Sequence, residues 1–134
     1  MIERFEGLDG RRRLIQCLER QELVRGDSAL AEALAEASDL IEVESGHAII
    51  EQDGNDNSLF LIIAGQASVI VNGREIVTRR QHQHVGEMAL IDPSARRSAT
   101  VLSKGNSVFL RVTEPIFASL AEENPDLWRR LAVE

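Results

Sequence analysis

The chain has 134 residues, of which 43% are hydrophobic and 28% are charged, and its formal net charge is −7 at pH 7. This length suits one domain with a substantial core, and the acidic balance argues against direct binding to nucleic acid, which needs a basic excess. No apolar run is long enough to cross a bilayer and the first residues lack the apolar stretch of a secretory signal, so we expect a cytoplasmic protein without a membrane partner.

Two helices are predicted to open the chain. Apolar residues recur at near-helical spacing over residues 11–24, and residues 28–37 form an alanine-rich stretch with two leucines four positions apart. Between them Gly26 breaks the helix, and Asp27 or Ser28 supplies the N-cap of the second one.

The first helix carries two features that could suggest chemistry. Arg11, Arg12 and Arg13 form a short basic run, which we assign to the exposed face of the helix. The single Cys17 cannot form an internal disulfide, and its apolar neighbours predict a buried or half-buried thiol rather than a nucleophile.

From residue 40 onward the apolar period changes to two, which predicts strands. Asn72-Gly73 is the strongest hairpin signal, because both turn positions tolerate positive φ. Gly46, Gly65 and residues 104–106 are predicted to separate other strands. The spacing favours an α+β fold, a small jelly roll or barrel with flanking helices, rather than βαβ units. The predicted strands cover residues 40–43, 48–51, 59–64, 67–71, 75–78, 99–102 and 108–112.

The segment after Gly86 is predicted to bind an anion. Residues 87–91 can form about one helical turn, whose first N–H groups have no intrahelical partner and carry the positive end of the peptide dipoles. Gly86 lets the backbone approach a ligand closely, and the small Ala89 keeps the following N–H groups accessible.

Three side chains around this turn predict a ligand with both a phosphate and a sugar hydroxyl. Arg97 offers a fork of donors to phosphate oxygens, and Ser98 adds a hydroxyl at the start of a strand over residues 98–103. Glu87 would repel a phosphate, so it is expected to face away and accept a hydrogen bond from a hydroxyl such as a sugar 2′-OH. Taken singly, a Glu in a first helical turn and a surface arginine have structural explanations, but their order and spacing favour binding.

A metal site is the alternative for the neighbouring histidines. His82 and His84 lie on the same side of an extended segment and Glu87 follows, which would suit a cupin-like metalloenzyme. That pattern wants a third histidine on a later strand, whereas His47 lies upstream, so no metal ligand is assigned. Without a nucleophile elbow or a nucleoside-triphosphate loop, no catalytic residue is assigned either.

The chain is predicted to return to helix after Thr113, which can cap residues 114–120. Residues 124–126, Asn-Pro-Asp, start a last helix that continues to the end of the sequence. Phe117 and Trp128 are interpreted as core or helix-packing residues rather than as a platform for stacking a base.

Residues 86–101 closely resemble the phosphate-binding cassette of cyclic nucleotide-binding domains, as in the catabolite activator protein family, cyclic-nucleotide-dependent kinases and nucleotide-gated channels. The resemblance spans roughly residue 40 to the C-terminus, although the loop 52–57 has the family's turn residues in an altered order. It implies a 3′,5′-cyclic mononucleotide ligand, no cofactor and no enzymatic activity in this chain. The implied contacts are a carboxylate on the 2′-OH, backbone near the sugar-phosphate, side chains on the cyclic phosphate and apolar residues at the base. The carboxylate is that of Glu87, and the backbone is that of Gly86, Met88 and Ala89. The side chains on the cyclic phosphate are Arg97 and Ser98, and the apolar residues at the base are Val69 and Val77.

The leading helices and the end of the cassette also resemble the sensor portion of bacterial antiphage effectors that carry a Toll/interleukin-receptor-like (TIR) domain. That resemblance implies a cyclic pyrimidine messenger, cUMP or cCMP, and NAD depletion by the attached domain. The whole of residues 1–134 is then one cyclic nucleotide-binding domain, with a helical leader over 1–38, a jelly roll over 39–112 and C-terminal helices over 113–134.

Relative to the family, the last helix is truncated, and this helix often forms a lid and a homodimer or higher oligomer. Two further alternatives stay open. One is a cAMP-type sensor of a transcription factor or channel, and the other is a jelly-roll interaction module that binds no ligand.

Overall fold

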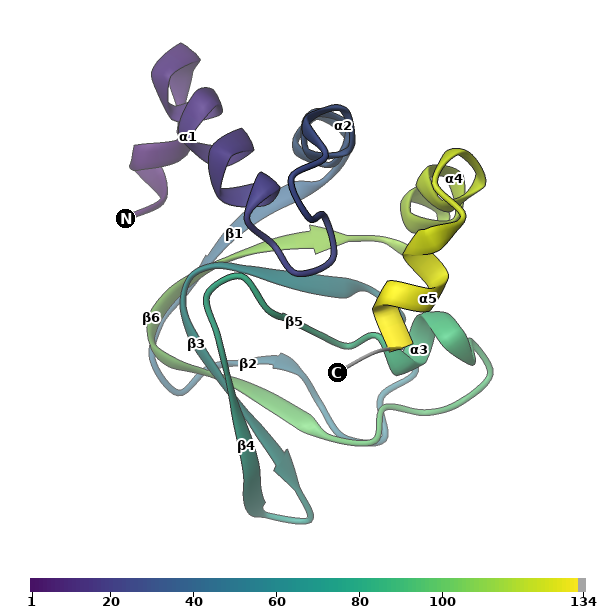
Figure 1. The fold of residues 1–134 in the computed structure, drawn as a ribbon. Helices are drawn as coiled ribbons and strands as arrows, with labels where there is room; N and C mark the ends of the chain where they lie inside the picture. Colours follow the sequence, from purple (N-terminus) through teal and green to yellow (C-terminus); the bar gives the residue numbers. More distant parts are fainter. Residues whose placement is uncertain (133–134) are drawn as a thin grey trace.

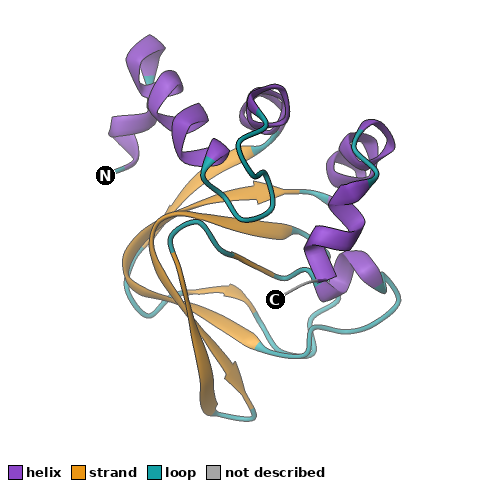
Figure 2. Ribbon diagram, viewed as in Figure 1, coloured by secondary structure: helices purple, strands orange, loops and turns teal. Residues whose placement is uncertain are grey.

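The computed structural model describes residues 1–132, which form a six-stranded antiparallel sheet with the helices gathered on one side (Figures 1 and 2). The strand order is β1-β6-β3-β4, with β2 paired to β6 and β5 paired to β3. In chain order the elements are η1 (Ile2–Phe5), α1 (Gly7–Glu19), α2 (Ser28–Ala37), β1 (Asp39–Val43), β2 (Ala48–Ile50), β3 (Leu59–Val71), β4 (Arg74–Arg80), β5 (His84–Val85), α3 (Met88–Ile91), β6 (Thr100–Val112), α4 (Glu114–Glu123) and α5 (Asp126–Ala132). The predicted α+β fold with flanking helices is confirmed.

The two longest strands, β3 and β6, correct the prediction that Gly65 and residues 104–106 end strands. Each strand runs for 13 residues, and their pairing shifts register around Gly65, as at a β-bulge. Gly65 has a φ of +94°, and a Cβ there would lie 3.0 Å from Cα of Ser107. Glycine therefore bends the strand instead of ending it, because it tolerates both the positive φ and the close approach.

The predicted hairpin at Asn72-Gly73 is confirmed, and it joins β3 to β4. Both turn residues have positive φ, +51° and +80°, as a type I′ turn requires. Across the hairpin Val69 pairs with Val77, so these two residues lie side by side. The hairpin projects away from the helices (Figure 1).

The first long helix begins and ends earlier than the predicted residues 11–24. After Glu19 the chain turns, with Arg25 and Gly26 at positive φ and the Gly26 N–H donating to the Glu19 carbonyl at 2.8 Å. Leu23 and Val24 are buried in this turn. Because these two residues are apolar, the helical pattern in the sequence continues past Glu19, and the helix was therefore predicted to end too late.

The N-cap of α2 is Asp27, whose carboxylate accepts a hydrogen bond from Leu30 N–H at 3.1 Å. This decides between the two predicted caps, since Ser28 is the first helical residue. We expect Asp27→Ala to lower the free energy of unfolding by about 1 kcal/mol. Urea denaturation measures the change, and Ser28→Ala is the matched control; an equal loss in both variants would contradict the capping role.

The core lies in two clusters on opposite faces of β3. Alternate residues of the strand, such as Leu61 and Ile63, pack against the helices, whereas Phe60 and Ile62 pack inside the curled sheet. Because both faces of β3 are covered, its sequence is apolar without alternation over residues 59–64.

The C-terminal helices largely follow the prediction. Thr113 is at the N-cap of α4, but its side chain makes no capping hydrogen bond, which corrects the predicted role. Phe117 is buried and Trp128 is 41% exposed, and their rings meet edge to face with centroids 4.9 Å apart. The predicted end of the last helix, residues 133–134, lies outside the described residues. No described helix is long and apolar enough to span a membrane.

Candidate ligand-binding site

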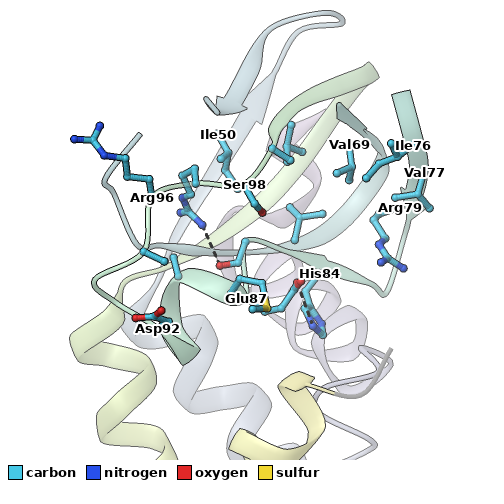
Figure 3. Close-up of a pocket in the computed structure, with 18 residues that line it drawn as sticks. Ile50, Val69, Ile76, Val77, Arg79, His84, Glu87, Asp92, Arg96 and Ser98 are labelled. Atoms are coloured by element: carbon cyan, nitrogen blue, oxygen red, sulfur yellow. Dashed lines mark hydrogen bonds and ion pairs between the residues drawn. The ribbon is translucent and has the colours of Figure 1, made fainter. Parts of the chain in front are cut away.

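A cavity of about 270 Å³ opens between the β3–β4 hairpin, α3 and the segment that leads into β6 (Figure 3). Each residue that the sequence predicts to contact a ligand lines this cavity: Val69, Val77, Gly86, Glu87, Met88, Ala89, Arg97 and Ser98. These residues come from segments as far apart as β3 and the approach to β6. The fold therefore brings the whole predicted set to one place.

One wall of the cavity is apolar. Figure 3 shows Val69, Ile76 and Val77 of the hairpin on one side, together with Arg79. Val69 and Val77 are partly buried, whereas Ile76 is 58% exposed. Such a wall suits a flat group with little charge.

The cavity is also lined by Arg97, which is only 5% exposed. Its Nη1 donates to the Gly86 carbonyl at 3.0 Å, and its Nη2 donates to the Ser58 carbonyl at 2.7 Å and to the Asp56 carboxylate at 2.8 Å. Its Nε is buried and has no hydrogen-bond partner among the described residues. The guanidinium group is thus held in place, and its Nε–H remains available to donate to an anion. A buried positive charge favours binding of an anion.

The backbone of Arg97 is tied to the loop whose residue order departs from the family pattern. Arg97 N–H donates to the Gly54 carbonyl at 2.7 Å, and Asp53 N–H donates to the Arg97 carbonyl at 2.8 Å. Asp53 has a positive φ of +70°. The altered loop therefore still packs against the cassette and fixes the arginine.

Gly86 and residues of the short helix α3 also line the cavity. Gly86 has a φ of +90°, and a Cβ there would lie 2.9 Å from the Ser58 carbonyl and 3.0 Å from Arg97 Nη1. Leu90 N–H donates to the Glu87 carbonyl at 3.0 Å, so α3 begins after Glu87 rather than at it. The first N–H groups of such a turn have no partner within the helix.

Glu87 lies beside His84 at the cavity (Figure 3). His84 Nε2 and Glu87 Oε1 are 3.7 Å apart, and the imidazole is almost fully buried. A carboxylate has two oxygens that accept hydrogen bonds, so Glu87 can contact more than one donor. A ligand hydroxyl is the kind of donor that this carboxylate can accept.

The predicted arrangement of the two histidines is wrong. His82 has a φ of +76° and belongs to a turn, so it is not in an extended segment with His84. Burial lowers the pKa of His82. The described residues contain no group of three or more His, Cys, Asp or Glu side chains that could hold a metal ion.

Three charged residues that line the cavity, Arg79, Asp92 and Arg96, were not predicted to contact the ligand. Arg79 follows Val77 by two positions on β4, so the two-residue period of a strand could have placed it on the same face. Arg96 also lines the rim, is exposed, and donates to the Asp53 carbonyl at 3.2 Å. Ser98 is exposed as well, and β6 starts at Thr100 rather than at residue 98.

Comparison with known families gives a match between residues 40–124 and the model of the cyclic nucleotide-binding domain. The chain belongs to this family. The family is one of sensor domains rather than enzymes, and the predicted family and ligand class, a cyclic nucleotide, are confirmed.

Among curated proteins, this cyclic nucleotide-binding domain is 44% identical over 134 residues to the Pycsar effector protein BcPycTIR of Burkholderia cepacia, covering 100% of this chain and 44% of the relative. It is 42% identical over 132 residues to XpPycTIR of Xanthomonas perforans, covering 98% of this chain and 44% of the relative. The chain therefore spans less than half the length of these relatives.

Among solved structures, the domain resembles a mutant regulatory subunit of a cAMP-independent protein kinase A from Trypanosoma brucei, bound to cAMP in its A site. The TM-score is 0.80 at 24% identity, covering 92% of this chain and 48% of the other. The sensor domain of the transcriptional regulator DNR from Pseudomonas aeruginosa gives a TM-score of 0.73 at 17% identity, covering 87% and 81% of the two chains. These likenesses concern the fold.

Proposed function

We propose that this domain is the sensor of a larger effector and binds a 3′,5′-cyclic mononucleotide in the cavity beside α3. The observation that carries the proposal is the convergence of the predicted contacts on a cavity that has an apolar wall and a buried arginine. At about 270 Å³ the cavity is near the lower end of ligand sites, which favours a compact ligand.

In the proposed complex the cyclic phosphate binds Arg97 and Ser98, and the backbone of the α3 turn lies near the sugar-phosphate. The 2′-OH donates to Glu87. The phosphate therefore lies at the positive Arg97, and the hydroxyl lies at the negative Glu87. The base lies on Val69 and Val77. The Nε of Arg97 is a donor that the phosphate can satisfy.

We further propose that the ligand is a cyclic pyrimidine, cUMP or cCMP, and that the full protein carries a TIR domain that depletes NAD in antiphage defence in the cytoplasm. The similarity to Pycsar effectors extends across the leading helices as well as the jelly roll, since it covers 100% of this chain in one relative and 98% in another. The division into a leader over 1–38, a jelly roll over 39–112 and helices over 113–134 is part of the same proposal.

The signal is proposed to pass from α3 to α5, which are in contact. In this proposal α5 has two positions in equilibrium. A ligand shifts that equilibrium only if its affinity differs between the two positions of the helix. The exposed Trp128 on α5 and any chain that follows it offer a surface for a homodimer or higher oligomer.

Isothermal titration with cAMP, cGMP, cCMP and cUMP tests the proposal. We expect one pyrimidine to bind at least about tenfold more tightly than either purine, a difference of about 1.4 kcal/mol. A purine preference would instead support a cAMP-type sensor, the second candidate, which the 31% identity over 104 residues to the cAMP-dependent protein kinase regulatory subunit of Schizosaccharomyces pombe favours. Binding of none of the four would overturn both in favour of an interaction module.

The role of Glu87 is tested with a ligand that lacks the 2′-OH. We expect the 2′-deoxy form of the preferred nucleotide to bind about tenfold or more weakly than the parent, because a hydrogen bond to a charged group is lost. In Glu87→Ala the parent and deoxy ligands should bind alike. A full deoxy effect that persists in the variant would assign the hydroxyl to another residue.

A further inference from the structure

Another cavity, of about 240 Å³, lies on the helix side of β3, between η1, α1 and the strand. It shares no lining residue with the ligand site, which lies toward the other face of the sheet. Its described lining residues are Arg4, Phe5, Arg13, Gln16, Cys17, Arg20, Ile63, Ala64 and Gln81. None of them is acidic, although the chain has 22 acidic and 15 basic residues.

Two of the arginines reach this cavity because of their spacing on the helix α1. Arg13, Cys17 and Arg20 are four and then three residues apart on or just after α1, so they share one face of the helix. The short helix η1 adds Arg4 from the other side. The basic run of the sequence is thereby divided, because Arg11 donates to the Ala35 carbonyl at 3.1 Å and only Arg13 reaches the cavity.

The three guanidinium groups have no ion-pair partner among the described residues. Arg13 Nη1 donates to the Arg4 carbonyl at 3.1 Å, and the Arg4 guanidinium carbon lies 5.6 Å from the centre of the Phe5 ring. Burial raises the pKa of the Cys17 thiol, and the charges of Arg20 and Arg4 partly offset this rise. Three exposed arginines therefore line one cavity of an acidic protein.

We propose that this cavity binds a small organic phosphate. Three guanidinium groups offer enough positive charge for a phosphate dianion, and each has a fork of donors for its oxygens. Phe5, Ile63 and Ala64 provide an apolar surface for the organic part. The volume is below the usual range for drug-sized ligands, so the group attached to the phosphate must be small.

Cys17 is a built-in reporter for this site, because it is the single cysteine of the chain and lines the cavity. The experiment measures the rate at which iodoacetamide alkylates the intact protein with and without phenyl phosphate, at constant ionic strength. At ten times its dissociation constant, phenyl phosphate should slow alkylation about tenfold, because about one site in eleven remains empty. The ratio of the two rates is compared, so a changed intrinsic rate in a variant cancels.

Three variants of similar shape make the test specific. Arg13→Gln and Arg20→Gln should each weaken the protection about tenfold in apparent affinity, as expected for loss of a charge-assisted contact. Arg12→Gln, on the same helix but outside the cavity, should leave protection unchanged. Circular dichroism confirms that each variant is folded.

The outcomes separate this site from others. Protection that persists in Arg97→Ala and with saturating cyclic nucleotide supports an independent site, whereas loss of protection in Arg97→Ala would place phenyl phosphate in the other cavity. Equal protection by phenol would show a merely apolar pocket and overturn the proposal, as would no protection at all. An acidic peptide that protects where phenyl phosphate fails would overturn it in favour of a protein partner.

Discussion

Arg97→Ala is expected to weaken binding of the preferred cyclic nucleotide by about tenfold to over a hundredfold, or roughly 1.5–3 kcal/mol. The side chain provides a buried charge at the cavity, and its Nε has no partner among the described residues. Removing it would take away the charge-assisted hydrogen bonds that we propose it makes to the phosphate. Isothermal titration of both proteins measures the difference.

Arg96→Ala is the matched comparison, because Arg96 also lines the cavity but is exposed and donates to the Asp53 carbonyl. We expect its affinity to stay within about twofold of the parent. Arg97→Lys keeps the charge but loses the forked pair of donors, so its affinity for the nucleotide should lie between those of Arg97→Ala and Arg96→Ala. Equal binding by Arg97→Ala and the parent would contradict the proposed phosphate site.

Arg97→Ala should also destabilise the domain without ligand. The carbonyls of Gly86 and Ser58 lose a buried donor, which costs roughly 1–3 kcal/mol. Binding must therefore be measured at a temperature where the variant is folded, and thermal unfolding followed by circular dichroism establishes that temperature.

Gly65→Ala is expected to lower the free energy of unfolding by about 2–5 kcal/mol, the sum of left-handed backbone strain and overpacking. Gly65 has a φ of +94°, and an added Cβ would lie 2.7 Å from Cβ and 3.0 Å from Cα of Ser107. The clash involves the backbone of β6, which pairs with β3 on both sides of this point. Urea denaturation at constant pH measures the loss.

Gly73→Ala separates the two causes of that loss. Gly73 also has a positive φ, +80°, but an added Cβ would meet nothing within 4 Å. Its expected loss is only the conformational part, about 1–2 kcal/mol. If both variants lost the same stability, the close approach of β3 and β6 at Gly65 would carry no energetic weight.

Local signals in the sequence were sufficient where a feature depends on neighbouring residues. The Asn72-Gly73 turn was predictable because its backbone angles depend on these two residues themselves. The N-cap of α2 was narrowed to two adjacent residues for the same reason. Errors arose at Gly65 and at the end of α1, where packing against distant segments decides whether the chain continues.

The sequence by itself determined the fold class, the β3–β4 turn, the cassette segment and the identity of the residues proposed to contact the ligand. The tertiary structure decided how they meet: it joined the β3–β4 hairpin to the cassette, added Arg79 and gave Arg97 its partners Asp56 and Ser58. It also placed Arg13, one of the three arginines of the basic run, in a second cavity. The physical reason is that turns and caps follow from short-range sterics and hydrogen bonds, whereas burial, strand continuity and ion-pair choice depend on segments that only folding brings together.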